Sequence, residues 1–234
     1  MEKSKILLDH IYNGLTSLHT SRTGMEIHAT NLIDFCPRAF LLCQREGLLY
    51  NDEEKIPGRR IITFEVGKAV EGVILRALQA SGVLRPLTEL YINVTPEIKV
   101  LGTPDGACIL TIEDEVYIIE LKTTGKDEIE TMIEPYINHV CQLSLYLWMA
   151  EIRRAPYVYT DGFVVYVSKL EKKEGIKVYH VQRNEAFIGR VREQLQVLKT
   201  FSESGGLPPR ICNSPTALMA KNHCGIPKIC FKEE

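Results

Sequence analysis

The chain has 234 residues, enough for one large domain or for one domain with an appendage. Its hydrophobic fraction of 45% and charged fraction of 25% are ordinary for a globular protein. The formal net charge of −2 excludes a protein that coats nucleic acid with a uniformly basic surface, so any site for a polyanion must be a local patch. The first residues do not resemble a secretory signal, and no stretch reaches the roughly 20 apolar residues of a membrane helix. We therefore expect a cytoplasmic protein.

In chain order, the spacing of apolar residues predicts helices first, then strands, then both. Helices are predicted over residues 5–18 and 64–81, with another that starts after Thr30 and is limited or kinked by Pro37. Residues 51–60 are interpreted as a loop. The predicted strands cover residues 89–94, 98–103, 106–112, 116–123, 162–168 and 176–181. The later helices are predicted over residues 134–152, with Pro135 in the first turn, and 185–202.

This order of elements suggests an α/β core with one central mixed sheet flanked by helices. An N-terminal helical part precedes the core, and a tail rich in Cys, Pro and Lys follows it. We predict that residues 1–60, 61–204 and 205–234 form these three parts of one integrated unit.

The cysteines are the first unusual feature of the sequence. Their number is odd, which argues against a disulfide framework in a reducing compartment and leaves metal binding, catalysis or burial. The seven are Cys36, Cys43, Cys108, Cys141, Cys212, Cys224 and Cys230. Cys108 and Cys141 lie in apolar contexts and are expected in the core.

Two carboxylates and a lysine form the second unusual feature. Asp105 lies between two glycines at a junction of predicted strands, where a turn exposes its carboxylate. Fifteen residues later, Glu120 and Lys122 point to one face of the next strand, because side chains alternate along a strand. Ile119 and Leu121 then face the core.

Such a set suits phosphodiester hydrolysis. Two carboxylates supply the oxygen ligands that Mg²⁺ prefers, and a metal held there polarises phosphate and lowers the pKa of bound water. A nearby lysine can orient or deprotonate that water, or neutralise the phosphate. The alternative is a surface aspartate and an exposed Glu/Lys pair on an edge strand. Because Asp-Gly follows one apolar strand and Glu-x-Lys lies within another, we favour the catalytic interpretation.

Pro104-Asp105 and Glu120-Leu121-Lys122 resemble the two halves of the PD-(D/E)XK signature. The resemblance implies a restriction-endonuclease-like core and a deoxyribonuclease that uses Mg²⁺ or Mn²⁺. In that family Asp105 and Glu120 would ligate the metal, the carbonyl of Leu121 would assist, and Lys122 would position or activate water.

Two helical motifs resemble the RecB-like branch of that family. His139-x-x-Gln142-x-x-x-Tyr146 lies on the helix after Lys122, and its spacing places the three side chains on one face. In that branch Gln142 and Tyr146 would face the active site; the alternative is core packing and a backbone hydrogen bond. Gly67-x-x-x-Glu71 resembles the motif before the sheet, where the second position is often His. Glu71 is therefore either a third metal ligand or a residue of the solvated helix edge.

Four cysteines resemble the ligands of iron–sulfur RecB-like nucleases, which include CRISPR-associated adaptation exonucleases and AddB-type nuclease domains. The resemblance implies a [4Fe–4S] cluster held by Cys36, Cys212, Cys224 and Cys230. Many members have a much shorter spacing than the one between Cys212 and Cys224, so Cys43 is an alternative ligand. Four thiolates would also bind Zn²⁺.

The resemblance covers about residues 30–232 and implies an exonuclease acting on single strands or DNA ends, in recombination, repair or CRISPR adaptation. Its partners would be DNA and recombination or CRISPR-adaptation proteins, without a membrane. Arg59 and Arg60, ahead of the helix that carries Glu71, are candidate contacts to phosphates. The alternative is a non-catalytic DNA-end-binding or interaction subunit of a larger complex, in which an iron–sulfur cluster or a zinc ion joins the two ends of the chain.

Overall fold

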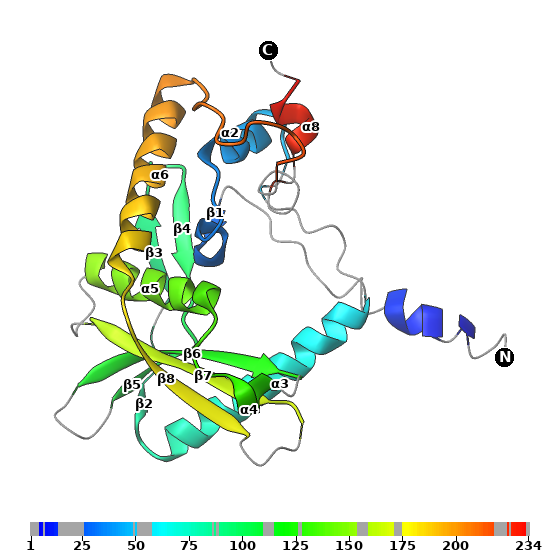
Figure 1. The fold of residues 1–234 in the computed structure, drawn as a ribbon, viewed down its shortest axis with the longest axis vertical. Coiled ribbons are helices and arrows are strands. Elements are labelled where there is room, and N and C mark those ends of the chain that lie inside the picture. The colour runs from blue at the N-terminus through cyan, green and yellow to red at the C-terminus, as the bar shows by residue number, and fades with distance from the viewer. Residues whose placement is uncertain are drawn as a thin grey trace.

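Two β-sheets organise the chain in the computed structural model (Figure 1). The structure describes residues 5–6, 8–13, 26–48, 50, 58–85, 87, 89–109, 115–125, 128–153, 159–170, 175–217, 224 and 226–232. The α/β class predicted from the sequence is confirmed, whereas the prediction of a single central sheet was wrong.

The larger sheet has five strands in the order β2-β5-β6-β7-β8. These strands are β2 (Leu84–Arg85), β5 (Gly106–Ile109), β6 (Val116–Thr124), β7 (Asp161–Ser168) and β8 (Ile176–Gln182). β6 and β7 pair in parallel and the other neighbours pair antiparallel, so this sheet is mixed as expected.

The smaller sheet has the order β1-β4-β3, with β1 (Glu26–His28), β4 (Lys99–Gly102) and β3 (Leu90–Asn93). β4 ends at Gly102, and β5 begins at Gly106 in the other sheet. Pro104 lies between them and has no N–H to donate to a ladder. The chain therefore crosses from one sheet to the other through residues 103–105, the segment that contains Asp105.

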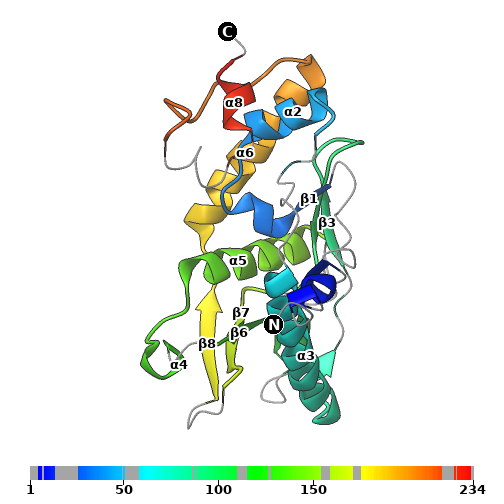
Figure 2. The same cartoon turned by 90° about the vertical axis from the view of Figure 1, so that its right-hand side faces the viewer.

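Helices cover both faces of the larger sheet. The structure has the 3₁₀-helix η1 (Ala29–Leu32) and the α-helices α2 (Pro37–Arg45), α3 (Gly58–Ala80), α4 (Glu128–Thr131), α5 (Ile137–Ile152), α6 (Glu185–Ser204) and α8 (Pro227–Cys230). α5 lies between the two sheets, and α3 crosses the opposite face of the five-stranded sheet (Figures 1 and 2). No described helix is long and apolar enough to cross a membrane.

Several predicted helix boundaries are corrected by the structure. Pro37 is the first residue of α2 and does not limit or kink a helix, because Cys36 caps that end and proline suits the first turn. α3 begins at Gly58, earlier than predicted, so Arg59 and Arg60 belong to a helix and not to a loop. Pro135 precedes α5, whose N-cap is Tyr136. Residues 5–6 and 8–13 are helical, and the rest of the predicted first helix lies outside the described residues.

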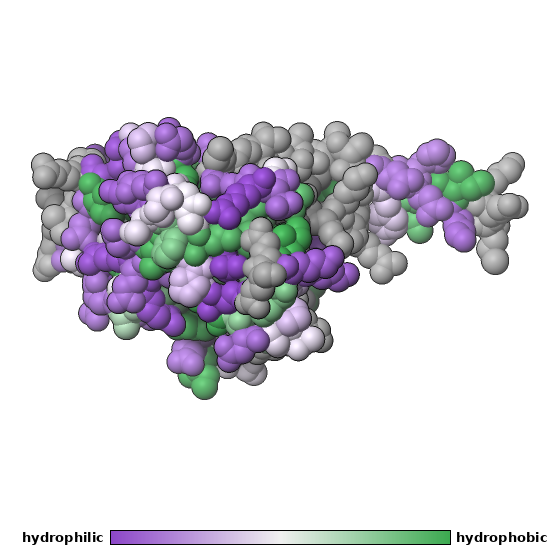
Figure 3. All heavy atoms as spheres, turned by 90° about the horizontal axis from the view of Figure 1, so that it is seen from above, coloured by the Kyte–Doolittle hydropathy of each residue, from purple (hydrophilic) through white to green (hydrophobic). Residues whose placement is uncertain are grey.

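The main hydrophobic core surrounds α5. Residues 141–150 of this helix are all buried, because one sheet packs on each side of it. A second core joins Ile119 and Leu121 of β6 to Val165 and Val167 of β7 beneath α3. Alternation along β6 therefore turns Glu120 and Lys122 toward α5. At the end of the molecule that carries α2 and α8, hydrophilic residues cover most of the described surface, with smaller hydrophobic areas between them (Figure 3).

Candidate active site

Asp105, Glu120 and Lys122 lie together where the chain crosses between the sheets. One carboxylate oxygen of Asp105, Oδ2, accepts a hydrogen bond of 2.6 Å from the backbone N–H of Leu121 in β6. The ammonium group of Lys122 forms an ion pair with Oε1 of Glu120. The structure thus brings together the three residues that the sequence predicted. Asp105 is half-buried, because its carboxylate accepts the N–H group of Leu121 in β6. The prediction that a turn exposes this carboxylate was therefore wrong.

Glu120 is buried, with only 2% of its surface exposed, and its Oε2 atom has no hydrogen-bond partner within the described part of the chain. Burial raises its pKa from 4.5 to about 8, and the nearby charge of Asp105 adds to this effect while Lys122 opposes it. Burial likewise raises the pKa of Asp105 to about 6, against the N–H of Leu121 and the charge of Lys122. A buried, unpaired carboxylate oxygen calls for a proton or a cation.

Glu71 lies on α3, one turn after Gly67, and is half-buried. Its charge contributes to the raised pKa of both Asp105 and Glu120, so it lies within electrostatic reach of them. A Cβ atom on Gly67 would lie 3.1 Å from Oγ1 of Thr123, so glycine permits the close approach of α3 to β6. Ligation of a metal by Glu71 or by the carbonyl of Leu121 remains a prediction.

Gln142 and Tyr146 are both buried on α5. Nε2 of Gln142 donates a hydrogen bond of 3.0 Å to the hydroxyl of Tyr146, one turn further along. The ring of Tyr146 lies against Gly102 at the end of β4, where a Cβ atom would come within 3.0 Å of it. These contacts show that the pair shares a helical face; a role at the active site remains a prediction.

The structure adds His139 and Tyr166 to the neighbourhood of Lys122. Tyr166 of β7 pairs in register with Lys122 of β6. Its hydroxyl lies 2.7 Å from Nδ1 of His139 and accepts a hydrogen bond of 3.0 Å from the backbone N–H of Tyr136. The helical spacing of His139 and Gln142 was visible in the sequence. Tyr166 was missed, because only the parallel pairing of β6 with β7 brings it there.

The predicted DNA contacts lie at the start of α3. Arg60 is exposed, and the side chain of Arg59 lies outside the described residues. Further along, Nζ of Lys169 donates a hydrogen bond of 3.2 Å to the carbonyl of Thr63. Contact between this end of α3 and phosphates remains a prediction.

A group of thiols lies between α2 and α8, at a distance from β6 along the long axis (Figure 1). Cys36 caps α2 and its Sγ accepts a hydrogen bond of 3.4 Å from Ala39. Cys43, two turns along α2, packs in one cluster with Cys36, Cys224 and Cys230. We call these four residues the thiol cluster. Arg210 helps to hold the tail, since its Nε donates to the carbonyl of Cys230 at 3.0 Å.

The charges of these thiols interact. Burial raises the pKa of Cys36 to about 11, with smaller contributions from the thiolates of Cys224 and Cys230. Burial also raises the pKa of Cys43 to about 11, with contributions from Cys224 and Cys36. Cys212 lies outside the packed cluster but contributes to the raised pKa of Cys224.

As the side chains stand, no group of three or more His, Cys, Asp or Glu residues in the described segments is arranged to hold a metal ion. Cys141 is buried in the core, as predicted. The side chain of Cys108, also expected there, is outside the described set.

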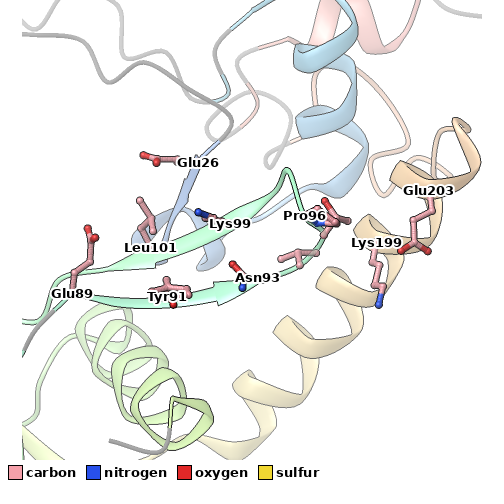
Figure 4. Close-up of a pocket in the computed structure, with 11 residues that line it drawn as sticks. Glu26, Glu89, Tyr91, Asn93, Pro96, Lys99, Leu101, Lys199 and Glu203 are labelled. Atoms are coloured by element: carbon pink, nitrogen blue, oxygen red, sulfur yellow. The ribbon is translucent and has the colours of Figure 1, made fainter.

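A pocket of about 760 Å³ opens elsewhere, between the β3–β4 hairpin and α6 (Figure 4). It is lined by Glu26, Glu89, Tyr91, Asn93, Val94, Thr95, Pro96, Lys99, Leu101, Lys199 and Glu203. None of the predicted catalytic residues is among them. The mixture of acidic and basic side chains favours neither an anion nor a cation, so this pocket is not the candidate active site.

The arrangement of elements is similar to that of known exonucleases. An alkaline exonuclease from Laribacter hongkongensis has a TM-score of 0.52 and 12% identity, over 77% of this chain and 89% of that chain. Its complex with dAMP has a TM-score of 0.51 and 12% identity, over 84% and 93%. A phage-related exonuclease from Haemophilus somnus has a TM-score of 0.49 and 14% identity, over 81% and 96%. The sequence matches no protein-family model and has no significant match among curated proteins. The chain therefore has a fold like that of the Laribacter alkaline exonuclease.

Proposed function

We propose that this chain is a metal-dependent DNA nuclease, an exonuclease that acts on single strands or DNA ends. The observation that carries the proposal is the buried Oε2 atom of Glu120, which lies beside Asp105 and Lys122 and has no partner among the described residues. Folding buries Glu120 where the charge of Asp105 disfavours its ionisation, an arrangement that costs stability without a cation. Active sites are where such costs are tolerated.

The donor set fits a hard divalent cation. Asp105 and Glu120 would hold Mg²⁺ or Mn²⁺ through carboxylate oxygens, with the carbonyl of Leu121 and Glu71 as further ligands. The bound metal supplies Lewis acidity toward phosphate and a water of lowered pKa. Lys122, paired with Glu120, would hold the attacking water or neutralise the phosphate.

The same proposal gives Gln142 and Tyr146 a positioning role. Their mutual hydrogen bond fixes both side chains on the face of α5 that also carries His139. Arg59 and Arg60 would contact phosphates at the start of α3. The fold that this chain shares with an exonuclease crystallised with dAMP supports DNA as the class of substrate. Action together with recombination or CRISPR-adaptation proteins is part of the proposal.

A [4Fe–4S] cluster is the proposed second cofactor, with Zn²⁺ as the alternative. The chemistry of the donors fits either, because thiolate sulfur suits both. Cys36, Cys224 and Cys230 pack together, as the proposal requires. The fourth ligand is Cys212 from the family pattern or Cys43 from the packing. Such a group would join α2 to the C-terminal tail and stabilise that end of the molecule.

Hydrolysis of end-labelled single- and double-stranded DNA tests this function. Anaerobically purified wild type should cut with Mg²⁺ or Mn²⁺ and stop in EDTA, and Lys122→Ala should lose at least about 100-fold in rate. Lys199→Ala changes an exposed lysine of α6 that lines the other pocket, and this matched control should cut normally. Metal-independent cutting, or equal rates for Lys122→Ala and wild type, would contradict the proposal. Binding without any cutting would favour a DNA-end-binding subunit.

A further inference from the structure

The hydrogen bonds around Tyr166 define which nitrogen of His139 carries the proton. A backbone N–H can only donate, so the bond from Tyr136 uses the Tyr166 oxygen as an acceptor. The phenolic proton of Tyr166 then has Nδ1 of His139, 2.7 Å away, as its acceptor. A neutral imidazole that accepts at Nδ1 carries its proton on Nε2.

Burial keeps this imidazole neutral. Burial and, to a smaller extent, the positive charge of Lys122 lower the pKa of His139 to about 4. The ring is only half-buried, and Nε2 has no hydrogen-bond partner among the residues that the structure describes. His139 is therefore a neutral donor whose Nε2–H group, unpaired within the described segments, lies in the electrostatic neighbourhood of Lys122.

The residues around His139 hold its imidazole ring in one position. Tyr166 is 1% exposed, is held in the parallel β6–β7 ladder opposite Lys122, and also packs edge-on against Tyr136. His139 lies in the first turn of α5, one turn before Gln142 on the same face. The core of the sheet, the helix and the ring thus fix one orientation of the imidazole.

We propose that His139 donates its Nε2–H to a phosphate oxygen of the DNA strand held at Asp105, Glu120 and Lys122, and that Tyr166 is the positioning residue that sets its tautomer. The inference rests on the proposed nuclease function and adds a substrate-binding residue to it. A neutral donor binds phosphate without repelling Lys122 or a metal ion, as a second cation would.

Two substitutions separate this role from a purely structural one. Asn at position 139 retains a polar group near Nδ1 for Tyr166 but does not reach the position of Nε2. Gln reaches the position of Nε2 with an N–H donor. We expect His139→Asn to lower kcat/KM by about 10- to 100-fold, the effect of one hydrogen bond to a charged group, with an unchanged unfolding temperature. His139→Gln should stay within a few-fold of wild type. His180→Gln, at an exposed histidine of β8, is the control and should change nothing.

The opposite order, with His139→Asn active and His139→Gln impaired, would show that the histidine serves only to join α5 to β7. The tautomer has its own readout, a ¹⁵N spectrum of histidine-labelled protein at pH 7. It should show Nε2–H in wild type and a tautomer mixture in Tyr166→Phe; an Nδ1–H or protonated ring in wild type would overturn the inference. DNA affinity in Ca²⁺ compares the Asn and Gln variants without turnover. If wild type binds DNA but cuts none, the nuclease proposal fails. In that case, a lower DNA affinity of His139→Asn than of His139→Gln still supports the role of His139. Equal DNA affinities of the two variants overturn that role.

Discussion

The unpaired oxygen of Glu120 has a consequence for stability that can be measured without any substrate. Burial and the charge of Asp105 raise the pKa of Glu120 from 4.5 to about 8. Between these values the folded protein keeps a proton that the unfolded chain releases. The contribution of Glu120 to stability is therefore complete below pH 4.5 and is lost as the pH rises toward 8.

Glu120→Gln replaces the carboxyl group with a neutral amide of almost the same size. Each pH unit between 4.5 and about 8 costs the folded wild type up to about 1.4 kcal/mol. The metal-free wild type should therefore lose on the order of 3 to 5 kcal/mol through this residue, and the variant should lose none. We expect similar free energies of unfolding at pH 4.5 and a more stable variant at pH 8.

Urea denaturation in EDTA at several pH values measures this difference, and Glu203→Gln, at an exposed glutamate of α6, serves as the control. Mg²⁺ or Mn²⁺ added at pH 8 should then stabilise wild type and leave Glu120→Gln almost unchanged, because the cation replaces the proton at the carboxylates. Parallel pH profiles for wild type and Glu120→Gln would refute the reasoning, since Glu120 would then ionise in the folded protein as easily as in the unfolded chain.

Two further predictions concern the thiol cluster and the parallel strand pair. Cys43→Ser should lower the iron and sulfide content, or the zinc content, of anaerobically purified protein more than Cys212→Ser does, because Cys43 packs with the other thiols; the reverse order, measured by metal analysis and visible absorption, would assign the fourth ligand to Cys212. Gly162→Ala should destabilise the fold by about 2 to 3 kcal/mol, because a Cβ atom there would press on the backbone oxygen of Ile118 in β6. Thermal unfolding measures this loss. The control is Gly189→Ala on α6, whose added Cβ atom meets open space and which should be neutral or slightly stabilising. Equal effects of the two glycine changes would contradict the close approach of β6 and β7.

Local patterns in the sequence predicted much of the site. The two-residue period of β6 placed Glu120 and Lys122 on one face and Ile119 and Leu121 on the other, and the structure confirms both faces. Most strand and helix boundaries were also close, because side-chain alternation and helical spacing depend on neighbours in the chain. The resemblance to PD-(D/E)XK nucleases rested on the same short motifs, and the fold agrees with it at the level of an exonuclease-like architecture.

Interactions between distant segments required the tertiary structure. The sequence contains no signal that divides the strands into two sheets, because the pairing partner of a strand is set by packing and not by its own period. The same reason explains why the thiol of Cys43 joins those of Cys224 and Cys230, and why Tyr166 meets His139. The sequence by itself identified Asp105, Glu120 and Lys122 as the candidates for the proposed chemistry. Only the folded chain decided that Glu120 would be buried with one oxygen left unpaired by the residues that the structure describes, since burial depends on what the rest of the chain packs around it.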